Sequence, residues 1–179
     1  PPLPLHFRRP SGVVWWEPTG NREWPFEMDL TYSTKHQELQ AEIRAFIEAE
    51  GHRSPKFGGG RNRPDQQALD WQGLLLERGY FARTVPTEYG GHGAEPDVLE
   101  TAIIADEFSR AGISPGLLDV GNLIVVPSLL DLGSEAQCAR WVRPTLTGET
   151  IWCIGNSEPG SGSDMANAQT KAVAVGDDF

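Results

Sequence analysis

Residues 151–164 read Ile151-Trp152-Cys153-Ile154-Gly155-Asn156-Ser157-Glu158-Pro159-Gly160-Ser161-Gly162-Ser163-Asp164. The first part is a short apolar run typical of a buried strand, and the second is a loop crowded with small residues and hydroxyls. Because glycine has no Cβ, such a loop lets a flat, polar or phosphorylated ligand lie directly against the main chain. The pattern alone also fits an ordinary strand-to-loop turn, since most Gly/Ser/Asp loops bind nothing.

The sequence before this stretch predicts helices. Apolar residues at helical spacing, with capping residues or glycine at the ends, indicate five of them, at about residues 33–51, 64–78, 96–109, 115–132 and 134–144. The fourth is apolar almost all round, which is typical of a buried helix. Ser134 to Gln137 form a capping box at the start of the fifth helix, and Pro144 is expected to end it.

After Gly148 the pattern changes to that of strands. Residues 151–156 are an apolar run, residues 169–175 alternate, and residues 176–178 are typical of a hairpin turn. The sequence therefore predicts an α+β protein: an all-helical domain of up-down helices over residues 31–148, then the first strands of a β domain over residues 149–179. Residues 1–30 are rich in Pro and Trp and show no period; their tryptophans predict an extended arm that is docked rather than free.

Composition excludes several classes of function. The 179 residues carry a formal net charge of −10, which argues against nucleic-acid binding because phosphate neutralisation needs clustered Lys and Arg. Cys138, Cys153 and the scattered histidines lack the spacing of a disulfide framework or a metal site. Since no apolar run is long enough to span a membrane and the N-terminal residues do not resemble a signal peptide, we expect a cytoplasmic location.

Three groups of motifs, in the same order and at the same spacings, resemble the flavin-dependent acyl-CoA dehydrogenases. Residues 75–81 and 85–93 are similar to the connector between their early helices. Pro127 with residues 133–137 resembles the end of their buried helix and the start of the next. A third group resembles their flavin-contacting loop and the hairpin beyond it: residues 147–149, Cys153, and residues 157–164, 170–172 and 176–177. The likeness covers about residues 35–179.

The resemblance implies a protein of three parts: a helical N-terminal domain, a β-barrel-like middle domain and a C-terminal helical bundle. This chain corresponds to the first part and the start of the second. Members of the family bind FAD and remove two hydrogens from the α and β carbons of an acyl-CoA thioester, and electrons pass to an electron-transfer flavoprotein. Their catalytic glutamate belongs to the bundle, so we expect no catalytic residue in this chain.

The resemblance also implies which residues bind ligands. The cofactor-binding residues would be Ile154, Gly155, Asn156, Ser157, Gly162 and Ser163. Ser163 also matches a serine that contacts the CoA part of the substrate. Asn122 lies in residues 121–124, which match a helix that lines the acyl pocket, and it is expected to bind substrate.

Several other residues have simpler interpretations. Glu158 lies in the motif but is expected to shape the turn rather than act as a base. His92 in a Gly-rich connector is expected to be exposed, and Cys153 in a strand to be buried. Trp141 and Trp152 are expected to pack in the core or at a domain seam.

Other functions remain open. The same fold also serves acyl-CoA oxidases, nitroalkane oxidases and flavin monooxygenases, which differ in how oxygen reaches the reduced flavin. A non-catalytic subunit of a heteromeric acyl-CoA dehydrogenase is a further alternative, although an inactive site has no physical need for the glycines and hydroxyls of residues 157–164. The resemblance implies a homo- or hetero-oligomer, in which the C-terminal part comes from residues beyond this chain or from a partner chain.

Overall fold

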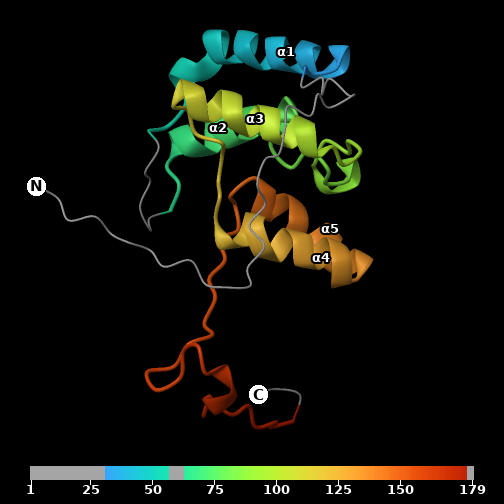
Figure 1. Ribbon diagram of the computed structural model, residues 1–179. Helices are drawn as coiled ribbons and strands as arrows, with labels where there is room; N and C mark the ends of the chain where they lie inside the picture. Colours follow the sequence, from blue (N-terminus) through green and yellow to red (C-terminus); the bar gives the residue numbers. More distant parts are fainter. Residues whose placement is uncertain (1–30, 57–62, 177–179) are drawn as a thin grey trace, which may run out of the picture. The chain divides into compact units, whose positions relative to one another are not determined.

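The computed structural model describes residues 31–56 and 63–176. The expected arm over residues 1–30 and the hairpin turn at residues 176–178, apart from Gly176, lie outside the described residues. The described residues form the α-helices α1 (Thr34–Glu50), α2 (Gln66–Glu77), α3 (Val98–Ala111), α4 (Val126–Leu132) and α5 (Glu135–Leu146) (Figure 1). Short helical turns lie at Gly51–Arg53, Thr87–Tyr89 and Met165–Asn167, and a π-helical turn at Gly121–Val125 leads into α4.

Side-chain caps explain where the helices begin. The sequence offers Ser33 or Thr34 as the cap of α1, and the structure shows that the Ser33 hydroxyl accepts the N–H of His36 there. Carboxylates of Asp65 and Asp97 cap α2 and α3 in the same way. At α5 both halves of the expected capping box between Ser134 and Gln137 are present. The helical N-terminal region predicted from the sequence is therefore confirmed.

The first three helices share one hydrophobic core. Helices α1 and α3 pack directly against each other (Figure 1). Four aromatic rings fill the centre: Phe46 lies 4.9 Å from Tyr80, 5.7 Å from Trp71 and 6.2 Å from Phe108, measured between ring centroids. Ile43, Leu75 and Ile103 complete the buried set. Large rings packed at these distances make the core of the first three helices rigid.

Helices α4 and α5 pack around a second, smaller core. It contains Val85, Val126, Cys138, Val142 and Leu146. The Cys138 thiol lies 3.1 Å from the carbonyl oxygen of Leu129, so it acts here as a small apolar residue with a weak donor. Phe81 packs against both cores and joins them.

The predicted buried helix over residues 115–132 is wrong in two respects. Residues 115–119 are not helical, because side chains of α2 bond to the backbone of this segment and of Ser114 beside it. The Trp71 indole N–H donates to the Ser114 carbonyl (2.9 Å), and the Gln72 amide oxygen accepts the Leu117 N–H (2.9 Å). The π-helical turn and α4 that follow are not buried all round either, since Leu123 in the turn is 59% exposed and Leu132 in α4 is 83% exposed.

The prediction that Pro144 ends α5 is also wrong. Helix α5 continues to Leu146, with Pro144 inside it. A proline removes the N–H that would bond the Arg140 carbonyl, but Arg140 is exposed, so water can reach that carbonyl instead. The Thr147 N–H still closes on the Arg143 carbonyl at 3.1 Å, so the helix keeps its final turn.

Residues 149–176 form no named strand within the described part of the chain. Residues 151–157 have no ladder partner there, and a strand without a partner is not a sheet. Local order comes instead from a bridge between Glu158 and Ser161 and from the turn at Met165–Asn167. The β-barrel-like middle domain and the boundary at residue 149 stay predictions. In the described residues, every helix is too short or too polar to cross a bilayer.

Candidate functional site

The six residues expected to contact a cofactor all lie on the surface of the described chain. They are Ile154, Gly155, Asn156, Ser157, Gly162 and Ser163. Their backbone N–H groups have no acceptor among the described residues. A Cβ at Gly155 or Gly162 would meet no atom within 4 Å, so the main chain is open to a ligand on that side. Exposed donors and an open backbone fit the edge of a flat, acceptor-rich ring such as a flavin.

Glu158 closes this loop. One carboxylate oxygen accepts the N–H of Thr170 at 2.7 Å, and the other accepts the N–H of Gln169 at 2.8 Å. Hydrogen bonding to Thr170 and Gln169 holds the pKa of Glu158 below its usual value, so the carboxylate stays ionised at neutral pH. These contacts agree with the expectation that Glu158 shapes the turn.

Ser161 fixes the inside of the same loop. It is only 4% exposed, although its neighbours on both sides are exposed. Its hydroxyl donates to the Asp164 carbonyl at 2.6 Å, and its backbone exchanges hydrogen bonds with Glu158 in both directions, at 2.8 and 3.1 Å. Sequence reasoning did not single out Ser161, and only its place between two glycines hinted at a tight turn.

The start of the loop is anchored on α5. The Trp152 indole N–H donates to the Thr145 hydroxyl at 2.8 Å, and that hydroxyl donates to the Trp141 carbonyl at 2.7 Å. The Trp141 and Trp152 rings meet edge to face with centroids 5.6 Å apart, which confirms that both are packing residues. Thr145 is fully buried, and no sequence signal pointed to it.

The same anchor touches the π-helical turn. A Cβ at Gly121 would lie 2.7 Å from both Thr145 Cγ2 and Trp152 Cδ1, so only glycine fits. Gly121 begins the π-helical turn, and such turns are frequent at functional sites. The segment expected to contact the acyl group is therefore in direct contact with the residue that leads into the cofactor loop.

Asn122 has an unusual side chain in this turn. Its amide N–H donates to an Asp119 carboxylate oxygen at 3.2 Å, and its backbone N–H donates to the same oxygen at 2.8 Å. Its amide oxygen is buried and has no hydrogen-bond partner among the described residues. A buried acceptor without a donor is costly, so a partner from a ligand or another chain would stabilise it.

The π-helical turn and α4 share an apolar surface that is open. Leu123 and Ile124 are at least half exposed, at 59% and 50%. Beside them lies a groove of about 330 Å³, whose walls carry mostly aliphatic side chains. Its residues are Ile124, Val125, Ser128, Leu129, Leu132, Gly133 and Gln137.

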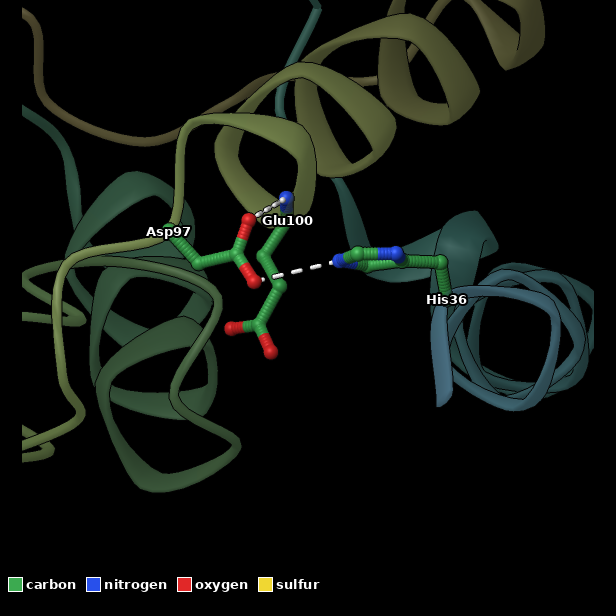
Figure 2. A group of neighbouring side chains, drawn as sticks. All are labelled: His36, Asp97 and Glu100. Atoms are coloured by element: carbon green, nitrogen blue, oxygen red, sulfur yellow. Dashed lines mark hydrogen bonds and ion pairs between the residues drawn. The ribbon is translucent and has the colours of Figure 1, made fainter. Parts of the chain in front are cut away.

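A second cluster of polar side chains lies between α1 and α3 (Figure 2). His36 Nε2 lies 3.1 Å from an Asp97 carboxylate oxygen, and Glu100 lies beside them. The Lys35 ammonium is 2.7 Å from one Glu100 oxygen, and the Arg83 guanidinium is 2.6 Å from the other. Because cations already occupy both oxygens of Glu100, the group is better explained as an electrostatic clamp between helices than as a metal site.

The charges of this clamp shift the pKa values of its acids. Hydrogen bonds from His36 and from the backbone of Glu100 lower the pKa of Asp97 to about 2. Hydrogen bonds from Lys35 and then Arg83 lower the pKa of Glu100, against the opposing effect of burial. Both carboxylates are therefore ionised at neutral pH. The expectation that the chain holds no metal site stays a prediction.

The exposure of Cys153 differs from the prediction, whereas that of His92 agrees with it. Cys153 was expected to be buried in a strand and is exposed, because no strand covers residues 151–157 in the described chain. His92 is exposed as expected, and its ring lies 2.6 Å from where a Cβ of Gly79 would stand. Gly79 also has a φ of +70°, which favours glycine.

Comparison with known proteins decides the family. A family model described as the N-terminal domain of acyl-CoA dehydrogenases matches residues 33–149. The chain belongs to the acyl-CoA dehydrogenase family. It is 41% identical over 102 residues to the human short-chain specific acyl-CoA dehydrogenase, a match that covers 56% of this chain and 24% of that protein. It is 30% identical over 147 residues to acyl-CoA dehydrogenase IpdE1 of Mycolicibacterium smegmatis, which covers 79% of this chain and 37% of the relative.

Solved acyl-CoA dehydrogenases have the same fold. The Tcur3481-Tcur3483 steroid ACAD matches with a TM-score of 0.59 and 31% identity, over 84% of this chain and 38% of that one. The ChsE4-ChsE5 complex of Mycobacterium tuberculosis matches with a TM-score of 0.59 and 27% identity, over 84% and 37%. The chain thus spans less than two fifths of these relatives' lengths. The family-model match ends at residue 149, before the loop at residues 151–164, so the cofactor-binding residues stay predictions.

Proposed function

We propose that this chain is part of an FAD-dependent acyl-CoA dehydrogenase that introduces a double bond between the α and β carbons of an acyl-CoA thioester. The observation that carries the proposal is the contact between Gly121 and Trp152, which joins the turn expected to face the acyl group to the loop expected to face the cofactor. Desaturation requires substrate and flavin to be held against each other, so their two surfaces must adjoin.

Each surface would have a distinct task. The unpaired N–H groups of Gly155 and Asn156 and the Ser157 hydroxyl would donate hydrogen bonds to the edge of the cofactor ring. FAD, when bound, supplies the acceptor for the hydride that leaves the β carbon. The Ser163 side chain would contact the CoA part. Leu123 and Ile124 of the π-helical turn would exclude water from the acyl group.

The base that removes the α proton is proposed to lie outside this chain. Glu158 directly follows Ser157 in sequence, but its carboxylate is held by the N–H groups of Gln169 and Thr170. A carboxylate engaged in this way, with a lowered pKa, is a weak proton acceptor. The chain therefore contributes binding and orientation, and the remaining part of the enzyme contributes the proton transfer.

The electron acceptor separates this proposal from its rivals of the same fold. Electrons from the reduced flavin would pass to an electron-transfer flavoprotein. An acyl-CoA oxidase or a flavin monooxygenase would instead consume oxygen during turnover, without any added acceptor. Oxygen uptake measured alongside dye reduction therefore distinguishes dehydrogenase from oxidase.

We also propose that the enzyme is an oligomer, and that a hetero-oligomer is favoured over a homo-oligomer. Two structural relatives carry paired names, and one is described as a complex of two proteins. A second chain could supply the C-terminal bundle that the resemblance implies. A non-catalytic role within such a complex is the rival outcome, and it predicts no flavin contact by residues 154–163.

The test is to express the protein with candidate partner chains and to examine the purified material for bound flavin. We expect a yellow protein whose visible absorbance is bleached by an acyl-CoA in the absence of oxygen. Butyryl-CoA and a steroid side-chain CoA thioester should both be offered, since the relatives include a short-chain and a steroid enzyme.

A matched pair of variants sharpens this test. Ser157→Ala removes the hydroxyl proposed to face the ring and should weaken FAD binding, whereas Ser109→Ala on the exposed side of α3 should not. Protein that stays colourless with FAD and every partner present would refute the proposal.

A further inference from the structure

Two backbone N–H groups converge on a single carboxylate at the end of the proposed cofactor loop. Glu158 accepts the N–H of Gln169 at 2.8 Å and that of Thr170 at 2.7 Å, and Thr170 is 12 residues further along the chain. The enclosed segment contains Gly162 and Ser163, two of the proposed cofactor contacts. A segment of this length that forms no ladder would otherwise sample many conformations.

The rest of the enclosed segment has its own short-range ties. Ser161 bonds to Glu158 and Asp164, and the turn at Met165–Asn167 brings the chain back towards Gln169. These ties span only a few residues each. The contact between Glu158 and the N–H pair is the one that joins the two ends of the segment, so it decides whether the loop is closed or open.

We infer that Glu158 is a positioning residue, which closes residues 158–170 into a loop and so holds Gly162 and Ser163 against the cofactor. This inference rests on the proposed function, because it assigns a purpose to the closure. A carboxylate suits the task since each of its oxygens takes one N–H, and hydrogen bonds to an ionised acceptor are stronger than neutral ones.

Replacement by glutamine tests the carboxylate specifically. Glu158→Gln keeps the length of the side chain but leaves one acceptor oxygen, and its amide N–H₂ would face the second backbone N–H. We expect roughly tenfold weaker FAD binding, the effect of losing one charge-assisted hydrogen bond and opposing a second donor. Glu149→Gln is the control, because Glu149 is exposed and has no hydrogen bond or ion pair among the described residues.

Two measurements are needed on the protein assembled with its partner chains. The first is FAD affinity, from titration of the deflavinated protein. The second is amide hydrogen exchange at Gln169 and Thr170, which reports the closure itself and needs no cofactor. We expect Glu158→Gln to weaken FAD binding and to speed exchange at both amides, with Glu149→Gln matching the wild type in each.

Each other outcome overturns the inference in a recognisable way. Faster exchange with unchanged FAD affinity would mean that the closure has no bearing on the cofactor. Weaker FAD binding with unchanged exchange would mean that Glu158 acts by another route. A wild-type protein that binds no FAD would remove the proposed function itself, whatever the exchange at Gln169 and Thr170.

Discussion

Gln72 is the residue whose replacement best tests how the helical region is held together. It is fully buried in α2, and its amide bridges two segments that no helix ladder can satisfy. The amide N–H donates to the Leu146 carbonyl at the end of α5 (2.7 Å), and the amide oxygen accepts the Leu117 N–H before the π-helical turn (2.9 Å). Replacing Gln72 with leucine keeps the volume and removes both hydrogen bonds.

The expected cost follows from the two groups left behind. A buried backbone group that loses its partner costs about 1–3 kcal/mol. Leu117 is half-buried, so water can recover part of its loss, and the apolar leucine side chain regains some free energy. We expect Gln72→Leu to lower the free energy of unfolding by about 2–4 kcal/mol, or the Tm by about 5–15 °C for a chain of this size.

Urea and thermal unfolding measure the effect, with Gln66→Leu as the control. Gln66 lies in the same helix but is exposed, and it bonds only to Asp70 one turn away. An exposed substitution of this kind changes stability by about 0.5 kcal/mol at most. If Gln72→Leu and Gln66→Leu cost the same, the bridge does not stabilise the fold as argued.

Two further changes test the seam and the clamp. Gly121→Ala places a Cβ 2.7 Å from Thr145 and Trp152, so urea unfolding should show that the free energy of unfolding falls by about 1–3 kcal/mol. The control Gly73→Ala meets no atom within 4 Å and should be neutral or stabilising. Equal effects of the two substitutions would contradict the tight contact at Gly121. The pKa of Asp97 is lowered from 3.8 to about 2, so its ionised form adds stability above about pH 4 that is lost as the pH falls towards 2. In Asp97→Asn the Tm should therefore change less with pH over that range. If the Tm falls with pH as it does in the wild type, other groups cause the loss of stability in acid.

The parts of the fold that the sequence predicted are those that local chemistry determines. Ser33 and the Ser134 capping box each act within four residues, and the apolar spacing of α1 and α3 lies within one helix. The segment before α4 could not be predicted in this way. Its apolar residues are typical of a helix, yet Leu117 is held in an irregular conformation by Gln72, which is 45 residues away in the sequence.

The candidate site shows the same division. The open main chain of the proposed cofactor loop could be predicted from its glycines and hydroxyls, and the six residues expected to bind the cofactor are exposed. Nothing in the sequence explains why residue 121 should be glycine. The structure supplies one, since Thr145 from α5 and the Trp152 ring both lie where a Cβ would stand.

The contact at Gly121 has a consequence for how the two proposed surfaces behave. Trp152 is held by Thr145 through a hydrogen bond of 2.8 Å, and both press on the start of the turn that carries Asn122. A change at this seam must therefore move the acyl-facing turn and the cofactor loop together, because close-packed groups transmit displacement. Variation far along α4, at the exposed Leu132, has no such path and should alter the groove alone. Under the proposed function, substrate preference would vary at the outer end of the groove while the proposed cofactor loop keeps its geometry.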